Sequence, residues 1–192
     1  MKWCVSTFTA KQMSIRWMLL ILLLCPWPPS SSAYADSQAR LAYAIKGALL
    51  TKIPKFVKWP TEVMDNDQLT ICTVGENPFK PSLKLLLKKK AFGKPIRFQS
   101  VNAEKLEQCQ LLFFSRHGLE KHPSILQNSQ RKAILTVSDH DGFLEMGGIL
   151  HMALESKKIK LTINRSAVER SGLKLRAQLY QLARVVTDSL GE

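Results

Sequence analysis

The 192-residue chain lacks the sequence signatures of the common enzyme classes. It has no G-x-S-x-G element to present a nucleophilic serine, and no glycine-rich phosphate loop followed by lysine. Its four histidines, His117, His122, His140 and His151, do not have the spacing of a zinc site. We therefore predict a protein that is not an enzyme and that has no catalytic residues, no bound metal and no cofactor.

A run long enough to cross a membrane is also missing. Residues 17–25 (WMLLILLLC) are apolar, but a transmembrane helix needs about 20 such residues. A basic segment precedes this run, Pro26 breaks it, and Ala33-Tyr34-Ala35 forms an A-x-A cleavage site. We predict that residues 1–35 are a cleavable secretory signal peptide and that 36–192 form a single exported domain. An uncleaved anchor, or lipid attachment at Cys25, is the alternative.

The chain has fewer acidic than basic residues. The chain has 28 Lys+Arg against 15 Asp+Glu, which gives a formal net charge of +13. Such a charge favours acidic partners: an acidic protein face, anionic lipid headgroups or a nucleotide. Export argues against nucleic acid as the partner. The densest basic run, Lys84 with residues 88–90, is expected to be a solvated helix end, where cations suit the carbonyl terminus.

Strand and helix patterns alternate along the exported part. Apolar runs predict strands at 69–75, 96–101, 110–115 and 133–138, and amphipathic patterns predict helices at 81–90, 103–107 and 117–127 between them. An opening helix at 37–59 should break near Lys52, because Pro54 lies inside its pattern. This alternation predicts βαβ units and a mainly parallel sheet.

The C-terminal third departs from this alternation. Two apolar runs, 149–154 and 159–163, are separated by the four residues 155–158 and predict an antiparallel hairpin. A helix should start at Asn164 or Ser166 and be interrupted or ended at Gly172, and leucines at helical spacing predict a last helix at 173–187. The predicted fold is an α/β three-layer sandwich, with a mainly parallel sheet, an antiparallel C-terminal hairpin at one edge, and helices on both faces.

Polar residues follow the predicted parallel strands. Ligands of open α/β sheets bind beyond the carboxyl ends of the strands. The loops there carry the candidate ligand or partner residues Glu76, Asn77, Arg116, His117, Asp139 and His140. Arg165 and Arg176, near the start of the last two predicted helices, could dock an acidic partner or a phosphate. The alternative is that all of these are polar surface residues without a binding role.

The chain resembles the YfiR-like family of small secreted bacterial proteins. Six segments match in order: KGALLTKIPKFVKWP, LTICTVGENPF, GKPIRFQSV, CQLLFFS, LTVSDHDGFLEMGGILHMALE and IKLTINRSAVERSGLKLRAQLYQLARVV. The resemblance implies a periplasmic α/β protein. It further implies a repressor that sequesters the periplasmic sensor domain of an inner-membrane diguanylate cyclase and so limits cyclic di-GMP synthesis and biofilm formation.

Other interpretations stay open at this stage. A periplasmic small-molecule-binding sensor module for another receptor, such as a histidine kinase, is the alternative function. A homodimer is compatible with the resemblance, nucleic acid is not an expected partner, and contact with the membrane should be peripheral at most.

Two cysteines, Cys72 and Cys109, lie outside the predicted signal peptide. In an oxidising compartment they can form one disulfide if their strands are parallel neighbours, and the resemblance supports this pairing. Two buried free thiols are the alternative. Better-known family members carry a second cysteine pair, at positions that align with Leu144 and His151 here. A redox switch built on that second bond is therefore not expected.

Overall fold

The computed structural model describes residues 31–64, 67–101 and 103–187. Contacts divide the chain into two units, Met1–Ala35 and Asp36–Glu192, and every strand belongs to the second unit. Most of the predicted signal peptide lies outside the described residues, so its cleavage stays a prediction. Within the described ranges, no helix combines the length and apolar character needed to cross a membrane.

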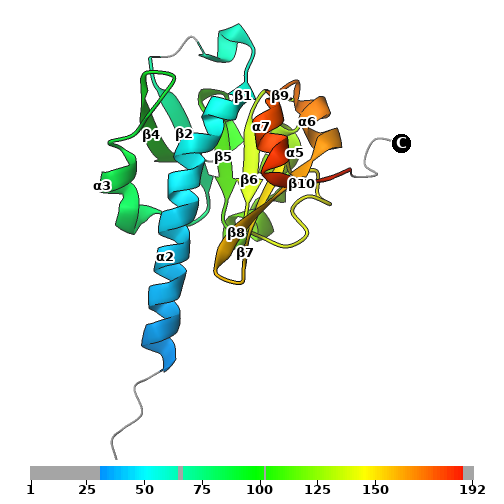
Figure 1. Ribbon diagram of the computed structural model, residues 1–192. Coiled ribbons are helices and arrows are strands. Elements are labelled where there is room, and N and C mark those ends of the chain that lie inside the picture. The colour runs from blue at the N-terminus through cyan, green and yellow to red at the C-terminus, as the bar shows by residue number, and fades with distance from the viewer. Residues whose placement is uncertain (1–30, 65–66, 102, 188–192) are drawn as a thin grey trace, which may run out of the picture. The chain divides into compact units, whose positions relative to one another are not determined.

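An eight-stranded sheet forms the centre of the fold, in the order β10-β8-β7-β6-β5-β2-β4-β3 (Figure 1). Pairing is parallel except between β7 and β8 and between β3 and β4. The strands are β2 Leu69–Val74, β3 Lys90–Ala91, β4 Lys94–Ser100, β5 Leu111–Phe114, β6 Leu135–Ser138, β7 Leu150–Glu155, β8 Lys158–Asn164 and β10 Ala183–Val186. A second sheet pairs β1 Val57–Lys58 with β9 Lys174–Leu175. The prediction of a mainly parallel sheet is confirmed.

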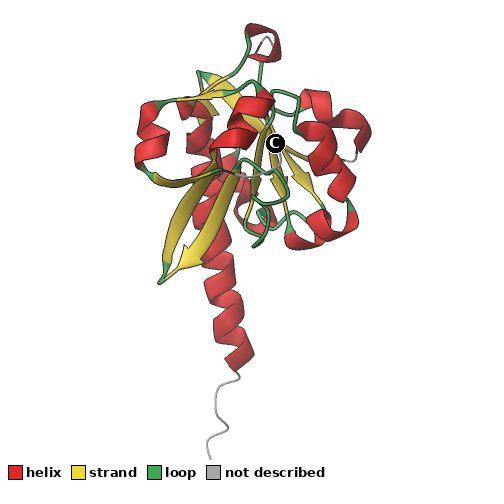
Figure 2. Ribbon diagram, turned by 90° about the vertical axis from the view of Figure 1, so that its right-hand side faces the viewer, coloured by secondary structure: helices red, strands yellow, loops and turns green. Residues whose placement is uncertain are grey.

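Helices cover both faces of the central strands, as Figure 2 shows. On one face, the helix α2 (Ser31–Lys52), the 3-10 turn η1 (Ile53–Phe56) and the short helices α3 (Leu83–Leu86), α6 (Arg165–Ser171) and α7 (Ala177–Gln181) pack on alternate strand residues such as Phe113 and Val137. On the other, η4 (Ala103–Gln108), α4 (Arg116–Lys121) and α5 (Pro123–Ser129) cover Leu112 and Phe114. β2, β5 and β6 are therefore buried along their whole length, which explains their continuous apolar runs. The three-layer sandwich is confirmed.

The predicted helix at 173–187 is wrong. The segment contains β9, then α7, then β10, which pairs in parallel with β8. The leucines of this segment have helical spacing, which suggested one continuous helix. Val185 and Val186 are β-branched, however, and they belong to the edge strand β10 of the sheet. The β7–β8 hairpin consequently lies one strand in from the edge, and β10 is the edge strand.

Other boundaries also shift for local reasons. The opening helix ends at Lys52, where Pro54 was expected to break it. The helix predicted at 81–90 shrinks to the 3-10 turn η3 (Lys80–Ser82) and α3, and the helix predicted at 117–127 is divided at His122 because Pro123 starts α5. The hairpin loop has two residues rather than four: Ser156 and Lys157 both have positive φ, as tight hairpin turns require.

Candidate functional site

A polar cluster lies where the sequence predicted one, beyond the carboxyl ends of β5 and β6. Asp139 follows β6, Arg116 starts α4 directly after β5, and Tyr43 and Lys46 come from α2. The Lys46 ammonium donates to Asp139 Oδ2 at 2.6 Å, and the two side chains are only 7% and 10% exposed. We name Tyr43, Lys46, Arg116 and Asp139 the strand-end cluster.

Tyr43 completes the environment of Asp139. Burial raises the pKa of Tyr43 to about 12, and the charge of Asp139 and a hydrogen bond to it act in the same direction, against the opposing charge of Arg116. The Lys46 ammonium also lies 4.9 Å from the centre of the Tyr43 ring. Since the Asp139 carboxylate already has both a phenol and an ammonium as partners, this arrangement ties α2 to the end of β6.

The histidines near this cluster make only loose contacts. His140 Nε2 and His117 Nδ1 each lie 3.9 Å from a carboxylate oxygen of Glu120, and the side chain of His117 is 64% exposed. The backbone N–H of His140 donates to Ser138 Oγ at 3.1 Å, which fixes the loop rather than the ring. Among the described residues of this edge, no activated nucleophile is formed.

The remaining predicted site residues have separate places. Asn77 is buried and its side chain accepts from the backbone N–H of Phe79 at 2.9 Å, so it shapes a turn, while Glu76 is exposed. Arg165 lies 5.8 Å from the Tyr180 ring centre, and it follows β8, whose antiparallel direction places it at the opposite end of the sheet from Asp139. Arg176 is exposed and occupies the N-cap position of α7, without a side-chain capping hydrogen bond. The eight candidates do not form one site.

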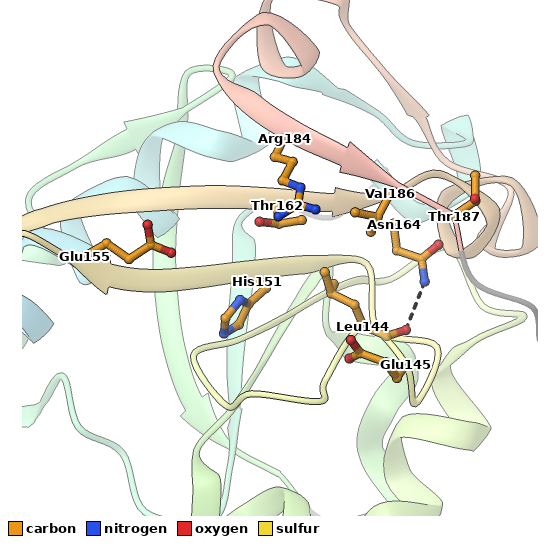
Figure 3. A pocket seen from close by; sticks show the side chains of 9 residues that line it. All are labelled: Leu144, Glu145, His151, Glu155, Thr162, Asn164, Arg184, Val186 and Thr187. Carbon is orange, nitrogen blue, oxygen red and sulfur yellow. Dashed lines mark hydrogen bonds between the residues drawn. The ribbon is translucent and has the colours of Figure 1, made fainter.

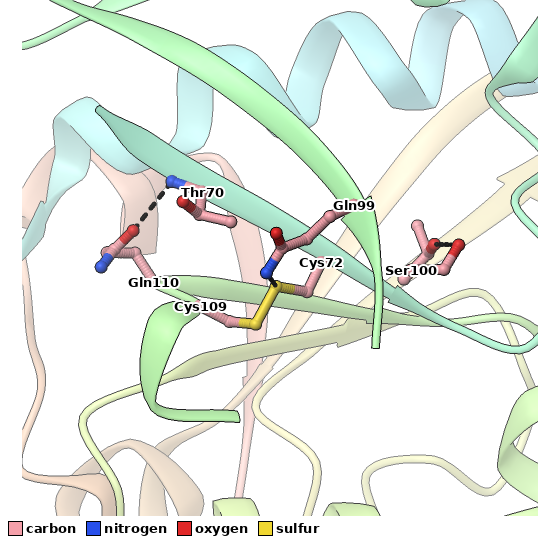
Figure 4. The surroundings of a disulfide bond; sticks show 7 residues. Thr70, Cys72, Gln99, Ser100, Cys109 and Gln110 are labelled. Atoms are coloured by element: carbon pink, nitrogen blue, oxygen red, sulfur yellow. Dashed lines mark hydrogen bonds between the residues drawn. A yellow bond between two sulfur atoms is a disulfide. The ribbon is translucent and has the colours of Figure 1, made fainter. Parts of the chain in front are cut away.

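A disulfide joins Cys72 of β2 to Cys109, which lies two residues before the neighbouring strand β5 (Figure 4), with a Cα–Cα distance of 5.8 Å. Both cysteines are buried, and Gln99 Nε2 lies 3.5 Å from Cys72 Sγ. Next to Cys109, the Gln110 amide accepts from the Thr70 N–H and donates to the Val63 carbonyl. The bond thus lies inside the sandwich and clamps the centre of the sheet.

A groove that the sequence interpretation missed lies on the open face of β7, β8 and β10 (Figure 3). Its volume is about 600 Å³, and it is lined by Leu144, Glu145, His151, Glu155, Thr162, Asn164, Arg184, Val186 and Thr187. Register places Arg184 beside Thr162 and Thr162 beside His151, so the three form a row across the strands. Leu144 and His151, where relatives are expected to carry cysteines, line the same groove.

Hydrogen bonding fixes one wall of this groove. Asn164 Nδ2 donates to the Leu144 carbonyl, while Asn164 Oδ1 accepts from the Ala167 N–H and caps α6. His151 Nε2 is buried, has no hydrogen-bond partner among the described residues, and lies 3.8 Å from Asp141 Oδ1. The alternating polar residues of the hairpin indicated a wet face, but Arg184 was assigned to a helix, so the groove could not be predicted.

Comparison with known proteins gives one family. A family model described as YfiR/HmsC-like matches residues 43–184, which is most of the chain and includes the disulfide, Asp139 and Arg184. The chain belongs to the YfiR/HmsC-like family. Members of this family are periplasmic regulators in cyclic di-GMP signalling, and the family resemblance expected from the sequence is therefore confirmed.

Other comparisons add less. No protein of curated function matches the chain. Among solved structures, the chain is similar to a conserved domain protein from Vibrio cholerae O1 biovar El Tor str. N16961, with a TM-score of 0.49 and 11% identity. That match covers 74% of the present chain and 59% of the other.

Proposed function

We propose that this protein is a periplasmic regulatory binding protein that sequesters the periplasmic sensor domain of an inner-membrane diguanylate cyclase. It thereby represses cyclic di-GMP synthesis and limits biofilm formation. The observation that carries this proposal is the YfiR/HmsC-like family match over residues 43–184. Residues 1–35 act as a cleaved signal peptide in this proposal, and the mature domain acts without catalysis of its own.

Features of the fold support a binding role. The Cys72–Cys109 disulfide suits an oxidising compartment such as the periplasm. The strand-end cluster, the most enzyme-like part of the surface, has its carboxylate occupied by Lys46 and Tyr43. Residues 36–192 have 25 Lys+Arg and 15 Asp+Glu, and the resulting formal net charge of +10 favours an acidic partner face or a position near the anionic membrane surface.

The test combines capture and signalling. Tagged protein, expressed in its own host with its full N-terminus, is recovered from solubilised inner membranes at physiological salt. We expect a diguanylate cyclase to co-purify, and deletion of the protein to raise cellular cyclic di-GMP. Recovery of no membrane protein, with unchanged cyclic di-GMP, would contradict the proposal. A Cys72→Ser/Cys109→Ser variant tests whether the clamp is needed for capture.

The groove favours a second candidate function, a sensor for a small solute. It is large enough for a small molecule, and the polar residues His151 and Arg184 are among those that line it. A solute that raises the melting temperature of wild-type protein but not of His151→Ala would support this function. Saturable solute binding without capture of any cyclase would favour it over sequestration.

A further inference from the structure

The two edges of the large sheet differ in how they are protected. At one edge, β3 has only two residues, Lys90 and Ala91, and it pairs with the Lys94-Pro95 end of β4. Short strands, lysine and proline are the usual means of preventing an edge from pairing with another chain. Lysine and proline thus protect the start of this edge, while the rest of β4, residues 96–100, has β2 as its one neighbour among the described strands.

The other edge is β10 (Ala183–Val186), which has no lysine or proline and carries one charged residue, Arg184. In the described part of the chain, β10 has β8 as its one neighbour in the sheet. Val185 is 42% exposed and Leu182, directly before the strand, is 67% exposed. An edge strand with exposed apolar side chains and neither lysine nor proline is suited to pairing with a further strand. This edge is therefore open to a strand from a binding partner.

Charge indicates which occupant fits. Arg184 pairs in register with Thr162, so Lys160 and Lys158, two and four residues earlier on β8, lie on the same face. Glu155 lies opposite Lys158, and Glu145 lines the adjoining groove together with Arg184. A hollow of about 550 Å³ follows β8 and β10 and is lined, among others, by Glu155, Lys158, Lys160, Leu182 and Arg184. The edge thus combines unpaired backbone, exposed apolar side chains and three cations.

We propose that β10 binds an extended, acidic segment of a partner protein as an additional strand of the sheet. Backbone hydrogen bonds supply affinity in this mode, and alternate side chains supply specificity. Acidic side chains of the segment pair with Arg184, Lys160 and Lys158, and its apolar side chains cover Val185 and Leu182. A second copy fits less well, because two antiparallel β10 edges would bring their arginines into one short ladder, where like charges repel.

The proposal rests on the proposed function only for the identity of the partner. Its test is photo-crosslinking in the living cell, with benzoylphenylalanine at Leu182. The matched control carries the same group at Leu85, which is equally exposed at 65% but lies on α3. We expect an adduct from position 182 alone, with the crosslinked peptide of the partner rich in aspartate or glutamate.

Charge variants decide the mode of binding. In the Leu182 crosslinking chain, Arg184→Glu should reduce the adduct at least tenfold, whereas Arg184→Lys should retain most of it. An adduct with an acidic segment of a protein other than a cyclase would support the edge site and contradict the proposed function. The edge site would be overturned if a cyclase is captured without an adduct from position 182, or if no adduct forms at all. It would also be overturned if the adduct contains only a second copy, or if Arg184→Glu leaves the amount of cyclase adduct unchanged.

Discussion

The strand-end cluster and the β10 edge teach opposite lessons about where this protein can bind a partner. The cluster gathers a carboxylate, a phenol and an ammonium, yet these groups satisfy one another and hold α2 to β6. The β10 edge has ordinary residues, but its apolar and cationic side chains remain exposed. Polar groups that are already paired stabilise the fold, and those left open are available to a partner.

Replacing Lys46 should have the largest effect on stability. Lys46→Met leaves the Asp139 carboxylate buried without its cation, and removing one partner of a buried ion pair costs about 3–5 kcal/mol. Urea denaturation measures the loss in the free energy of unfolding. The exposed Arg40–Asp36 pair is the control: Arg40→Ala should cost less than about 1 kcal/mol. Equal costs for the two variants would show that Asp139 is not held as described.

Removing the disulfide should have a comparable effect. Cys72→Ala/Cys109→Ala releases a constraint between residues 37 apart in sequence, which is worth about 3–4 kcal/mol in the chain-entropy model. Thermal unfolding with and without reductant measures it. The double variant should match the reduced wild-type protein, and reductant should leave the variant unchanged. Identical melting of wild-type protein before and after complete reduction would argue against a clamp.

A smaller loss is expected at the wall of the groove. Asn164→Ala removes the buried cap of α6 and the part-buried hydrogen bond to the Leu144 carbonyl, at a cost of roughly 1–3 kcal/mol. Hydrogen exchange should show faster exchange at Ala167, whose N–H loses its acceptor, with β2 and β5 unaffected. Uniform acceleration over the whole sheet would contradict a local role.

The smallest stability effect is the pH dependence of Tyr43. Its pKa is raised from 10.0 to about 12 in the folded protein, so between these values the folded state keeps a proton that the unfolded state releases. The contribution is complete below pH 10 and is lost as the pH rises to about 12. Because Tyr43 is only partly buried, we expect roughly 1 kcal/mol. Comparison with Tyr43→Phe over this range isolates it, and parallel pH profiles for the two proteins would contradict a raised pKa of Tyr43.

Much of the fold could be predicted because the central strands are buried on both faces. A residue such as Phe113 contacts one helical layer and Phe114 the other, so β5 is apolar throughout and recognisable in the sequence. The proximity of Cys72 and Cys109 could be predicted for the same reason, because they lie in or just before the neighbouring parallel strands β2 and β5. The C-terminal segment was harder, since Leu175, Leu179 and Leu182 have helical spacing although they lie in a strand, a helix and a turn.

The site was harder to predict than the fold. The sequence predicted that Arg116 and Asp139 lie at one edge of the sheet, since both follow parallel strands. It could not show that Lys46, from a helix distant in sequence, forms an ion pair with Asp139. Nor could it bring Arg184 next to Thr162, because that depends on β10 pairing with β8. Partners that are remote in sequence decide which polar residues stay free.

The most direct test compares one substitution at the two regions. Arg116→Glu and Arg184→Glu both reverse an exposed arginine, the first in the strand-end cluster and the second on the β10 edge. Each variant is titrated against the cyclase recovered by wild-type protein, after a melting curve has shown that it is folded. We predict that Arg184→Glu weakens binding at least tenfold, about 1.4 kcal/mol, and that Arg116→Glu changes it little. Loss of binding in Arg116→Glu alone would place the partner at the strand ends and contradict this account.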